Sequence, residues 1–371
     1  MSDPPLRRGW TTGTCAAAAA KAAYAALLTG EFPDPVEVTL PKGQRPSFAL
    51  AVTRQDEHSA TAGIVKDAGD DPDVTHGALV LATIRRAAPG AGIVFRAGEG
   101  VGTVTRPGLP VPPGEPAINP VPRRMIRDAM AEVTDAAQPL DIEVEIAIPG
   151  GEALATRTMS ARLGIIGGLS ILGTTGIIIP YSCSAWIHSI HQGIDVARAS
   201  GISHVAAATG STSEAAVQRL YSLPEVALID MGDFVGGTLK YLRKHPLPRL
   251  TIAGGVAKMT KLAQGLLDLH SKRGAVDLVA LAALAQDAGA PSALRQRILA
   301  ANTAAEAFAH AAQENLPLGD LVARAGWQTA ARVLEGTDIA LEVAVFDRDG
   351  QLVGRAPFAS AHDISPPRKR R

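Results

Sequence analysis

Short runs in which apolar and polar residues alternate dominate the first part of the chain, a pattern typical of β-strands. Glycine, proline and charged residues separate these runs, which favours turns between them. The pattern predicts strands at residues 36–40 (VEVTL), 47–53 (SFALAVT), 78–84 (ALVLATI), 92–97 (GIVFRA) and 141–148 (DIEVEIAI). We therefore expect an α+β domain over residues 1–150, in which a helix near the start of the chain packs on a sheet.

From about residue 162 onward, each apolar segment is followed by a glycine-containing turn and a helical stretch. Such alternation predicts β-α-β units and parallel strands. Strands are expected at residues 204–208 (HVAAA), 225–230 (EVALID), 249–254 (RLTIAG) and, after alanine- and leucine-rich helices between 272 and 334, at 339–346 (IALEVAVF). The pattern thus predicts a second domain over residues 151–371, of the α/β class with a mainly parallel, Rossmann-like sheet.

Arginines follow a proline-rich segment between the two regions. Residues 107–122 contain seven prolines and predict an ordered loop, because proline interrupts internal strands and helices. A helix is expected over residues 122–136. Arg124 and Arg127 lie three positions apart on it, so both side chains can reach one partner.

The distribution of charge argues against a nucleic-acid-binding protein. The formal net charge is zero, but four of the 36 basic residues occupy positions 368–371, which leaves 32 basic against 36 acidic residues in the rest of the chain. Nucleic-acid binders carry a basic folded surface. We interpret the terminal PPRKRR segment as a disordered, solubilising tail rather than a targeting or polyanion-binding run.

The sequence also lacks membrane and export signals. No uninterrupted apolar run approaches the roughly 18 residues that span a bilayer. No apolar segment follows Arg7 and Arg8, as a signal peptide would require. The two cysteines, Cys15 and Cys183, are too few for a disulfide framework. We expect a soluble, cytoplasmic protein with no membrane partner.

The segment from residue 10 to 28, WTTGTCAAAAAKAAYAALL, joins a hydroxyl- and glycine-rich turn to an alanine-lined helix. The first N–H groups of a helix lack intrahelical partners and carry partial positive charge, so they attract anions. The candidate anion-binding residues are Thr11, Thr12, Gly13, Thr14 and, further along the helix, Lys21. An N-cap followed by a small-residue face that packs on a sheet explains the pattern equally well.

Five segments of the chain together resemble one enzyme family. They are GWTTGTCAAAAAKAA (9–23), KDAGDDPDVTHG (66–77), GEGVGTVTRPGL (98–109), PAINPVPRRMI (116–126) and RLGIIGGLSILGTTGIIIPYS (162–182). In this order they are similar to the cobalt-precorrin-5B (C(1))-methyltransferases, the CbiD-type enzymes of the anaerobic cobalamin pathway. The resemblance implies methylation of C1 of cobalt-precorrin-5B by S-adenosylmethionine, which gives cobalt-precorrin-6A in cobalamin biosynthesis.

For such a reaction the protein must align the methyl group with C1 and hold a macrocycle fringed with carboxylates. The candidate substrate-binding residues are then the helix start, Thr11, Thr12, Gly13 and Thr14, together with Lys21, Arg124 and Arg127. Arginine is suited to this task because its guanidinium pairs with carboxylates through two hydrogen bonds. The catalytic residues are unknown from the sequence; Asp70 and His76, in the second of the five segments, are the candidates for a place near the reacting ring.

The methyl donor is expected at the carboxyl ends of the parallel strands in the second domain. Glycines there allow the backbone to approach a nucleoside, and acidic residues can accept hydrogen bonds from ribose hydroxyls. The candidate donor-binding residues are Gly167, Gly168, Thr209, Gly210, Glu214, Asp230, Asp233, Gly254 and Gly255. For Glu214, a capping box with Ser211 is an equally simple explanation.

No resident metal is predicted. The acidic residues from Asp67 to Asp73 do not match the calcium-loop spacing, and an Asp-Pro turn explains them as well. His188, His191 and Asp195 share a helix face, but no further strong zinc ligand accompanies them. The cobalt belongs to the corrinoid substrate. We interpret Cys15 as a small packing residue.

Two segments depart from the family pattern and leave a second function open. The chain has GGVAKMTKLAQG from Gly254 where the pattern has a Gly-His pair, and TGSTSE at 209–214 where it has a GNHGE-like turn. A non-catalytic carrier of tetrapyrrole intermediates in the same pathway is therefore the alternative to the enzyme. Assembly into a homo-oligomer is also left open.

Overall fold

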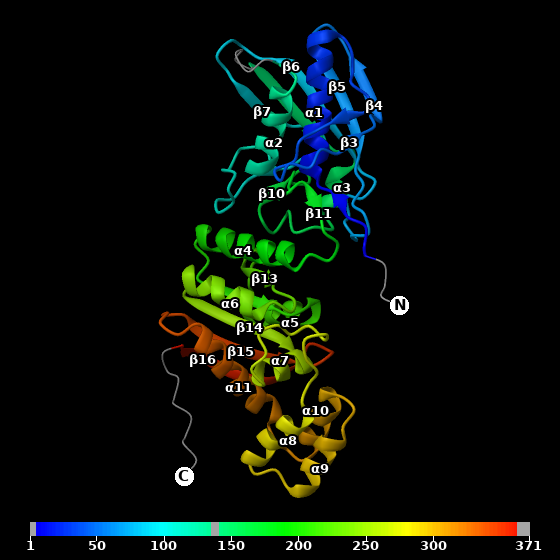
Figure 1. Cartoon of the computed structure of the whole chain (residues 1–371). Helices are drawn as coiled ribbons and strands as arrows, with labels where there is room; N and C mark the ends of the chain where they lie inside the picture. Colours follow the sequence, from blue (N-terminus) through cyan, green and yellow to red (C-terminus); the bar gives the residue numbers. More distant parts are fainter. Residues whose placement is uncertain (1–4, 135–140, 362–371) are drawn as a thin grey trace. The chain divides into compact units, whose positions relative to one another are not determined.

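The structure, a computed structural model, describes residues 5–134 and 141–361 (Figure 1). The chain forms two compact units, Met1–Cys183 and Ser184–Arg371. The division lies 33 residues later than the expected boundary at residue 150, because two short strands beyond that residue pair within the first unit. The predicted disordered basic tail lies outside the described residues.

A five-stranded sheet in the order β4-β5-β6-β9-β7 forms the centre of the first unit. Neighbouring strands run antiparallel except β7 and β9, which are parallel. The strands are β4 (Val52–Gln55), β5 (Ser59–Val65), β6 (Leu79–Arg86), β7 (Ile93–Ala97) and β9 (Ile142–Ala147). The strands predicted at 78–84, 92–97 and 141–148 are confirmed. The prediction omitted β5, whose SATAGIV sequence is mostly small residues.

The remaining predicted strands of this unit are shorter than expected. The segment 36–40 contributes only β2 (Val36–Glu37), which pairs with β3 (Ser47–Phe48). The segment 47–53 is divided between β3 and the start of β4. Two further pairs are β1 (Gly9–Trp10) with β11 (Ile177–Ile178), and β8 (Thr103–Val104) with β10 (Ile165–Ile166); α3 (Gly151–Ala155) is a single short helix.

Two helices pack on this sheet. Helix α1 (Thr12–Thr29) lies on β5 and β6, and α2 (Pro120–Ala131) lies beside it. The alanines of α1 from residue 16 to 20 are at most 1% exposed, so the helix backbone can approach the strands closely. Helix α2 begins with a proline, as expected at a helix N-terminus, and ends before the predicted residue 136. The proline-rich segment before it is a loop, as predicted.

A second five-stranded sheet, in the order β13-β12-β14-β15-β16, forms the centre of the other unit. The first four strands are parallel and β16 is antiparallel, so this sheet is mixed. The strands are β12 (His204–Ala208), β13 (Leu228–Asp230), β14 (Arg249–Gly255), β15 (Ala340–Phe346) and β16 (Leu352–Ser360). The four predicted strand positions are confirmed, although a 3-10 turn, η1 (Glu225–Ala227), replaces the start of the second. The edge strand β16 was not expected.

Helices cover both faces of this sheet. Helix α5 (Ser211–Tyr221) packs on one face over the alanines of β12, β14 and β15. The other face packs against α4 (Cys183–Ala199), α6 (Val235–Lys244), α7 (Val256–Ala263) and α11 (Leu318–Val333). Helices α8 (Leu278–Asp287), α9 (Ser292–Ala300) and α10 (Ala304–Gln313) complete the predicted helical region. Among the described helices, none is both long and apolar enough to cross a bilayer.

Gly167 and Gly168, which we expected at the rim of this sheet, lie instead in the first unit, after β10. A Cβ on Gly168 would lie 2.2 Å from the carbonyl oxygen of Gly100, so two backbone segments meet there without room for a side chain. This close approach explains the glycine at position 168 by packing.

Candidate functional site

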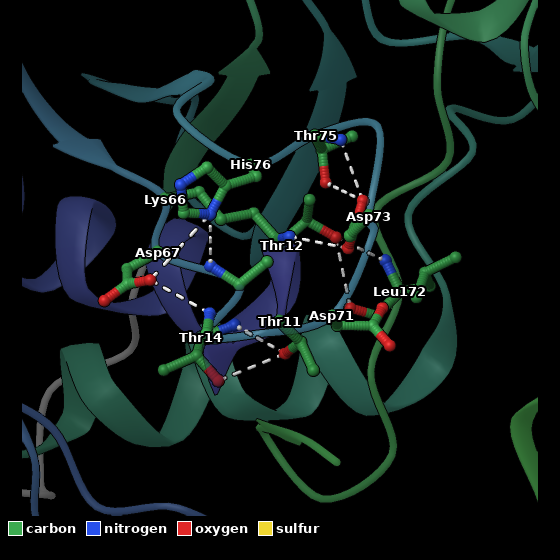
Figure 2. A network of polar contacts seen from close by, with 12 residues as sticks. Thr11, Thr12, Thr14, Lys66, Asp67, Asp71, Asp73, Thr75, His76 and Leu172 are labelled. Carbon is green, nitrogen blue, oxygen red and sulfur yellow. Dashed lines mark hydrogen bonds and ion pairs between the residues drawn. The ribbon is translucent and has the colours of Figure 1, made fainter. Parts of the chain in front are cut away.

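The N-terminus of α1 is capped by its own residues. Thr11 is the N-cap, and its Oγ1 accepts a hydrogen bond from the backbone N of Thr14 at 3.2 Å. The two threonine hydroxyls also lie 3.1 Å apart. Figure 2 shows Thr11, Thr12 and Thr14 together at the start of the helix. All three are buried, with at most 5% of their surface exposed.

Residues 172–176 of the same unit cover the start of this helix. Thr12 Oγ1 donates to the carbonyl of Leu172 at 3.2 Å, and the backbone N of Gly13 donates to the same carbonyl at 3.0 Å. Thr14 Oγ1 donates to the carbonyl of Gly176 at 2.7 Å. The groups that we considered for anion binding are therefore occupied within the protein. This geometry favours packing over ligand binding for the helix start.

Lys21, the other candidate on α1, is also occupied. Its Nζ donates to the carbonyl of Glu37 at 2.7 Å and to Glu132 Oε2 at 2.5 Å. The side chain is only 16% exposed. Lys21 thus joins the helix to β2 and to the residue that caps α2.

We predict that Ala16→Leu lowers the free energy of unfolding by about 1 to 3 kcal/mol, because Ala16 is fully buried and a larger side chain overpacks its site. Leucine itself is a good helix former, so helix propensity contributes little. The measurement is thermal unfolding of the free protein, with Ala25→Leu at a half-buried position of α1 as the matched control. An unchanged unfolding temperature for Ala16→Leu would contradict the packing role.

A loop between β5 and β6 carries the acidic residues, and each of them accepts at least one hydrogen bond. Asp67 accepts hydrogen bonds from the Arg7 guanidinium, and Asp70 accepts one from the Arg7 backbone N at 2.6 Å. Asp71 accepts one from the backbone N of Tyr181 at 2.9 Å. The hydrogen bonds from Arg7 and from Gly69 lower the pKa of Asp67 to about 2. These contacts hold the loop against the neighbouring segments of the unit.

Lys66, which the sequence analysis did not single out, is the buried cation of this loop. Its side chain is 1% exposed, and Nζ lies 2.7 Å from Asp73 Oδ2 (Figure 2). Thr75 donates to the other oxygen of Asp73 through its backbone N and its hydroxyl, at 2.8 and 2.6 Å. Burial alone would raise the pKa of Asp73, but Lys66 and these hydrogen bonds lower the pKa below its ordinary value. Nothing in the local pattern pointed to Lys66, because the strand that precedes it, β5, was not predicted.

His76 and Asp70, the candidates for proton transfer, are placed differently from each other. The His76 side chain is 53% exposed, and its Nδ1 accepts a hydrogen bond from the backbone N of Ala68 at 3.1 Å. A neutral ring with Nδ1 as acceptor carries its proton on Nε2. Asp70 is tied to the backbone of Arg7. Both residues are exposed.

The arginines of α2 differ in what they contact. Arg123 is tied to the protein through the carbonyls of Ile118 and Pro116 and the carboxylate of Glu115. Arg124 and Arg127 are exposed. The guanidinium of Arg127 lies 5.1 Å from the centre of the Phe95 ring, an arrangement that favours cation–π attraction. Arg124 and Arg127 thus present charge at the surface of the first unit.

In the second unit, the carboxyl ends of three parallel strands bring most of the donor-binding candidates together. Thr209 and Gly210 follow β12, Asp230 ends β13, and Gly255 ends β14. A Cβ on Gly210 or Gly255 would meet no atom within 4 Å, so the backbone at both positions borders open space. The other candidates at this edge are Glu214 in the first turn of α5, Asp233 before α6, and Gly254.

Gly254 is packed rather than open. A Cβ there would lie 2.5 Å from Met259 Cε and 2.8 Å from Thr209 Oγ1. For Glu214 the predicted capping box with Ser211 is not found, since Gly210 is the N-cap of α5 and no side chain caps the helix.

Two residues at this edge were not among the predicted site residues. Lys258, in the first turn of α7, donates to the carbonyl of Thr209 at 2.7 Å. Trp186, near the start of α4, is 48% exposed, and its Nε1 donates to the carbonyl of Asp230 at 3.2 Å. Lys258 comes four positions after the predicted strand 249–254, whereas a lone tryptophan on a helix gave no signal.

Of the residues considered for zinc, His191 and Asp195 are engaged otherwise. The rings of His191 and Tyr241 stack with centres 3.8 Å apart, and Tyr241 donates to Asp195 Oδ2 at 2.6 Å. Within the described ranges, no three His, Cys, Asp or Glu side chains are grouped as metal ligands. Cys15 is fully buried, and this burial raises the pKa of its thiol to about 12, as suits a packing residue.

Comparison with known proteins places the chain in a family. Residues 1–180 match the profile of a family described as CbiD, and residues 268–357 match that described as CbiD, C-terminal domain. A protein of Bradyrhizobium sp. (strain BTAi1 / ATCC BAA-1182), named cobalt-precorrin-5B C(1)-methyltransferase, is 63% identical over 100% of this chain and 99% of its own length. The chain belongs to the CbiD family.

Two further relatives are also named cobalt-precorrin-5B C(1)-methyltransferase. The protein of Agrobacterium fabrum is 63% identical over 97% of this chain and 96% of its own length. That of Halorhodospira halophila is 60% identical over 95% of each. A crystal structure of the cobalamin biosynthesis protein CbiD from Archaeoglobus fulgidus matches 68% of this chain and 77% of its own, with 26% identity and a TM-score of 0.38. The resemblance inferred from the five segments is thus confirmed.

Proposed function

We propose that this chain transfers a methyl group from S-adenosylmethionine to C1 of cobalt-precorrin-5B, giving cobalt-precorrin-6A in cobalamin biosynthesis. The observation that carries the proposal is the 63% identity, over the whole chain, to a relative named for this activity. At that identity over both units, a shared reaction is the simplest explanation.

The chemistry requires little covalent assistance from the protein. The sulfonium of the donor makes its methyl group electrophilic, and the electron-rich macrocycle supplies the carbon nucleophile. The protein contributes alignment of the two groups, since correct positioning alone accelerates such a step greatly. A proton that leaves the product needs an acceptor, and our candidates are Asp70 and His76. In His76 the nitrogen that would take the proton is Nδ1, which must first release the hydrogen bond from the Ala68 backbone N.

We assign the donor to the carboxyl edge of the sheet in the second unit. The strand order places β12 beside both β13 and β14, with α5 and α6 on opposite faces, an arrangement that supports our interpretation of this mixed sheet as doubly wound. In such sheets the ligand crevice opens where the strand order reverses, here between β12 and β14, since β13 and β14 lie on opposite sides of β12 and the crossover helices lie on opposite faces. Gly210 and Gly255 flank that position and border open space. Glu214 and Asp230 are the candidates for the ribose hydroxyls.

We assign the carboxylates of the corrinoid to Arg124 and Arg127, which are exposed on α2 of the first unit. We predict that replacing either by alanine weakens corrinoid binding by about 1.5 to 3 kcal/mol, the range for a hydrogen bond to a charged group. Donor affinity should remain within twofold, about the precision of the titration. Calorimetric titration of each ligand is the measurement, and Arg157→Ala, at an exposed arginine after α3, is the control. Unchanged corrinoid affinity would remove both residues from the site.

The activity itself is tested by anaerobic incubation of the full chain with cobalt-precorrin-5B and donor labelled at the methyl group. Mass analysis should show one labelled methyl added to the macrocycle. A carrier of tetrapyrrole intermediates, the alternative function, would bind the corrinoid without binding or consuming the donor. Corrinoid binding without donor binding or consumption would reject the methyltransferase function and favour the carrier function.

A further inference from the structure

Lys258 connects the ends of three parallel strands in the second unit. It belongs to the first turn of α7, the helix that follows β14. Its Nζ lies 2.7 Å from the carbonyl oxygen of Thr209, the residue after β12. The same Nζ lies 3.1 Å from Oδ1 of Asp233, beyond β13. The ammonium is therefore held at the position where the proposed crevice opens, beside Gly210 and Gly255.

The contact with Asp233 is an ion pair but not a complete hydrogen bond. Oδ1 of Asp233 is inaccessible to solvent and accepts no hydrogen bond of good geometry from the described residues, although Nζ is near. A lysine ammonium has three donors, and two acceptors surround this one in the described part of the chain. The Lys258 side chain is 36% exposed. A ligand that enters the crevice can thus reach a positive charge whose hydrogen bonds are not all used.

The local charge indicates which ligand group fits. Because Asp233 balances Lys258, the edge presents one positive and one negative group side by side, rather than the surplus of positive charge that a polyphosphate requires. One carboxylate that replaces Asp233 at the ammonium fits this arrangement. The amino-acid end of S-adenosylmethionine carries such a carboxylate beside an ammonium, so its net charge matches that of the pair.

We propose that Lys258 binds the α-carboxylate of the methyl donor and so selects donors with an intact amino-acid end. Asp233 is a positioning residue that keeps the ammonium of Lys258 directed at the crevice before the donor binds. The inference rests on the proposed function, since it assumes that the donor occupies this edge. The competing explanation is that Lys258 only ties the strand ends together.

The test compares two ligands by calorimetric titration of the full chain: S-adenosylmethionine and its decarboxylated analogue, which lacks only the α-carboxylate. The parent should bind the intact donor about 10- to 100-fold more tightly, as expected for one charge-assisted hydrogen bond. Lys258→Met should lose that preference and bind the analogue about as well as the parent does. Lys258→Arg should keep most of the preference, and Asp233→Asn should reduce it.

A matched control is Lys240→Met, which removes an exposed lysine of α6 and should leave the preference unchanged. If Lys258→Met lowered the affinity for both ligands equally, or kept the preference for the intact donor, Lys258 would have a structural role and this proposal would be wrong. The proposed function would not be affected by that result. If the parent bound neither ligand, the donor assignment, and with it the proposed function, would fail first. Circular dichroism of each variant shows that the fold is retained.

Discussion

Replacing Lys66 with methionine is expected to lower the local stability of the first unit by about 3 to 5 kcal/mol, the cost of breaking a buried ion pair from one side. Lys66 is 1% exposed, and Asp73 is its carboxylate partner at 2.7 Å. Because methionine fills a volume similar to that of lysine, the loss of stability is caused by the missing charge and not by a cavity. Amide hydrogen exchange of β5 and the neighbouring α1, in the full chain, measures it.

The contribution of the Lys66–Asp73 pair to stability depends on pH, because the pair lowers the pKa of Asp73. Asp73 has a pKa below its ordinary value of 3.8 in the folded protein. Its contribution to stability is therefore complete above that ordinary value and is lost as the pH falls through the lowered folded pKa. In Lys66→Met the principal cause of the lowering is gone. The stability of the variant should then decline less steeply than that of the parent below about pH 4.

The double variant Lys66→Met/Asp73→Asn provides the control. Removing both charges leaves no buried ion without its partner, so the double variant should be more stable than the sum of the single losses implies. Additive losses, or a loss below about 1 kcal/mol for Lys66→Met alone, would show that the pair contributes little.

Replacing Gly319 with alanine should destabilise the second unit by about 3 kcal/mol or more, at the upper end of overpacking effects. Gly319 is in the first turn of α11, where a Cβ would lie 1.8 Å from the carbonyl oxygen of Val353 on β16. That oxygen belongs to the backbone and cannot turn away. The helix and the edge strand must separate, although alanine is by itself the better helix former.

Gly326→Ala, in the same helix, is the matched control. Its Cβ would meet Leu262 Cδ2 at 3.5 Å, an ordinary contact. Here the higher helix propensity of alanine should dominate and raise stability by about 0.5 to 1 kcal/mol. Denaturant unfolding of both variants, followed by far-ultraviolet circular dichroism, compares them. Equal effects of the two substitutions would refute the proposed close contact between α11 and β16.

Much of the fold follows from local pattern. The alternation in residues 141–148 and the apolar run at 204–208 predicted β9 and β12 directly. Alternating apolar residues indicate a strand with one buried face, and a continuous apolar run indicates a strand buried on both faces. The five family segments identified the family. The carboxyl edge of the second sheet also followed, since Gly210 and Gly255 come within two positions of the ends of the predicted strands 204–208 and 249–254.

Other features depended on contacts between distant segments. The segment of β5 is so rich in small residues that its pattern does not predict a strand. It forms a strand because β4 and β6 pair with it on either side. Strand β16 is similarly defined by its pairing with β15. Gly168 follows an apolar pair as a rim glycine would, yet its close approach to Gly100 places it in the first unit.

The sequence by itself determined the family, the helix and strand positions with strong periodicity, and the residue types at the sheet edge. Only the tertiary structure decided how the polar groups are used. The hydroxyls of Thr12 and Thr14 bind the backbone of residues 172–176, about 160 positions away, rather than an open surface. Lys258, after β14, meets Asp233, after β13, across the end of the strand β12 that lies between them. Local periodicity records burial, whereas the partner of a hydrogen bond or charge depends on which distant segments the fold brings together.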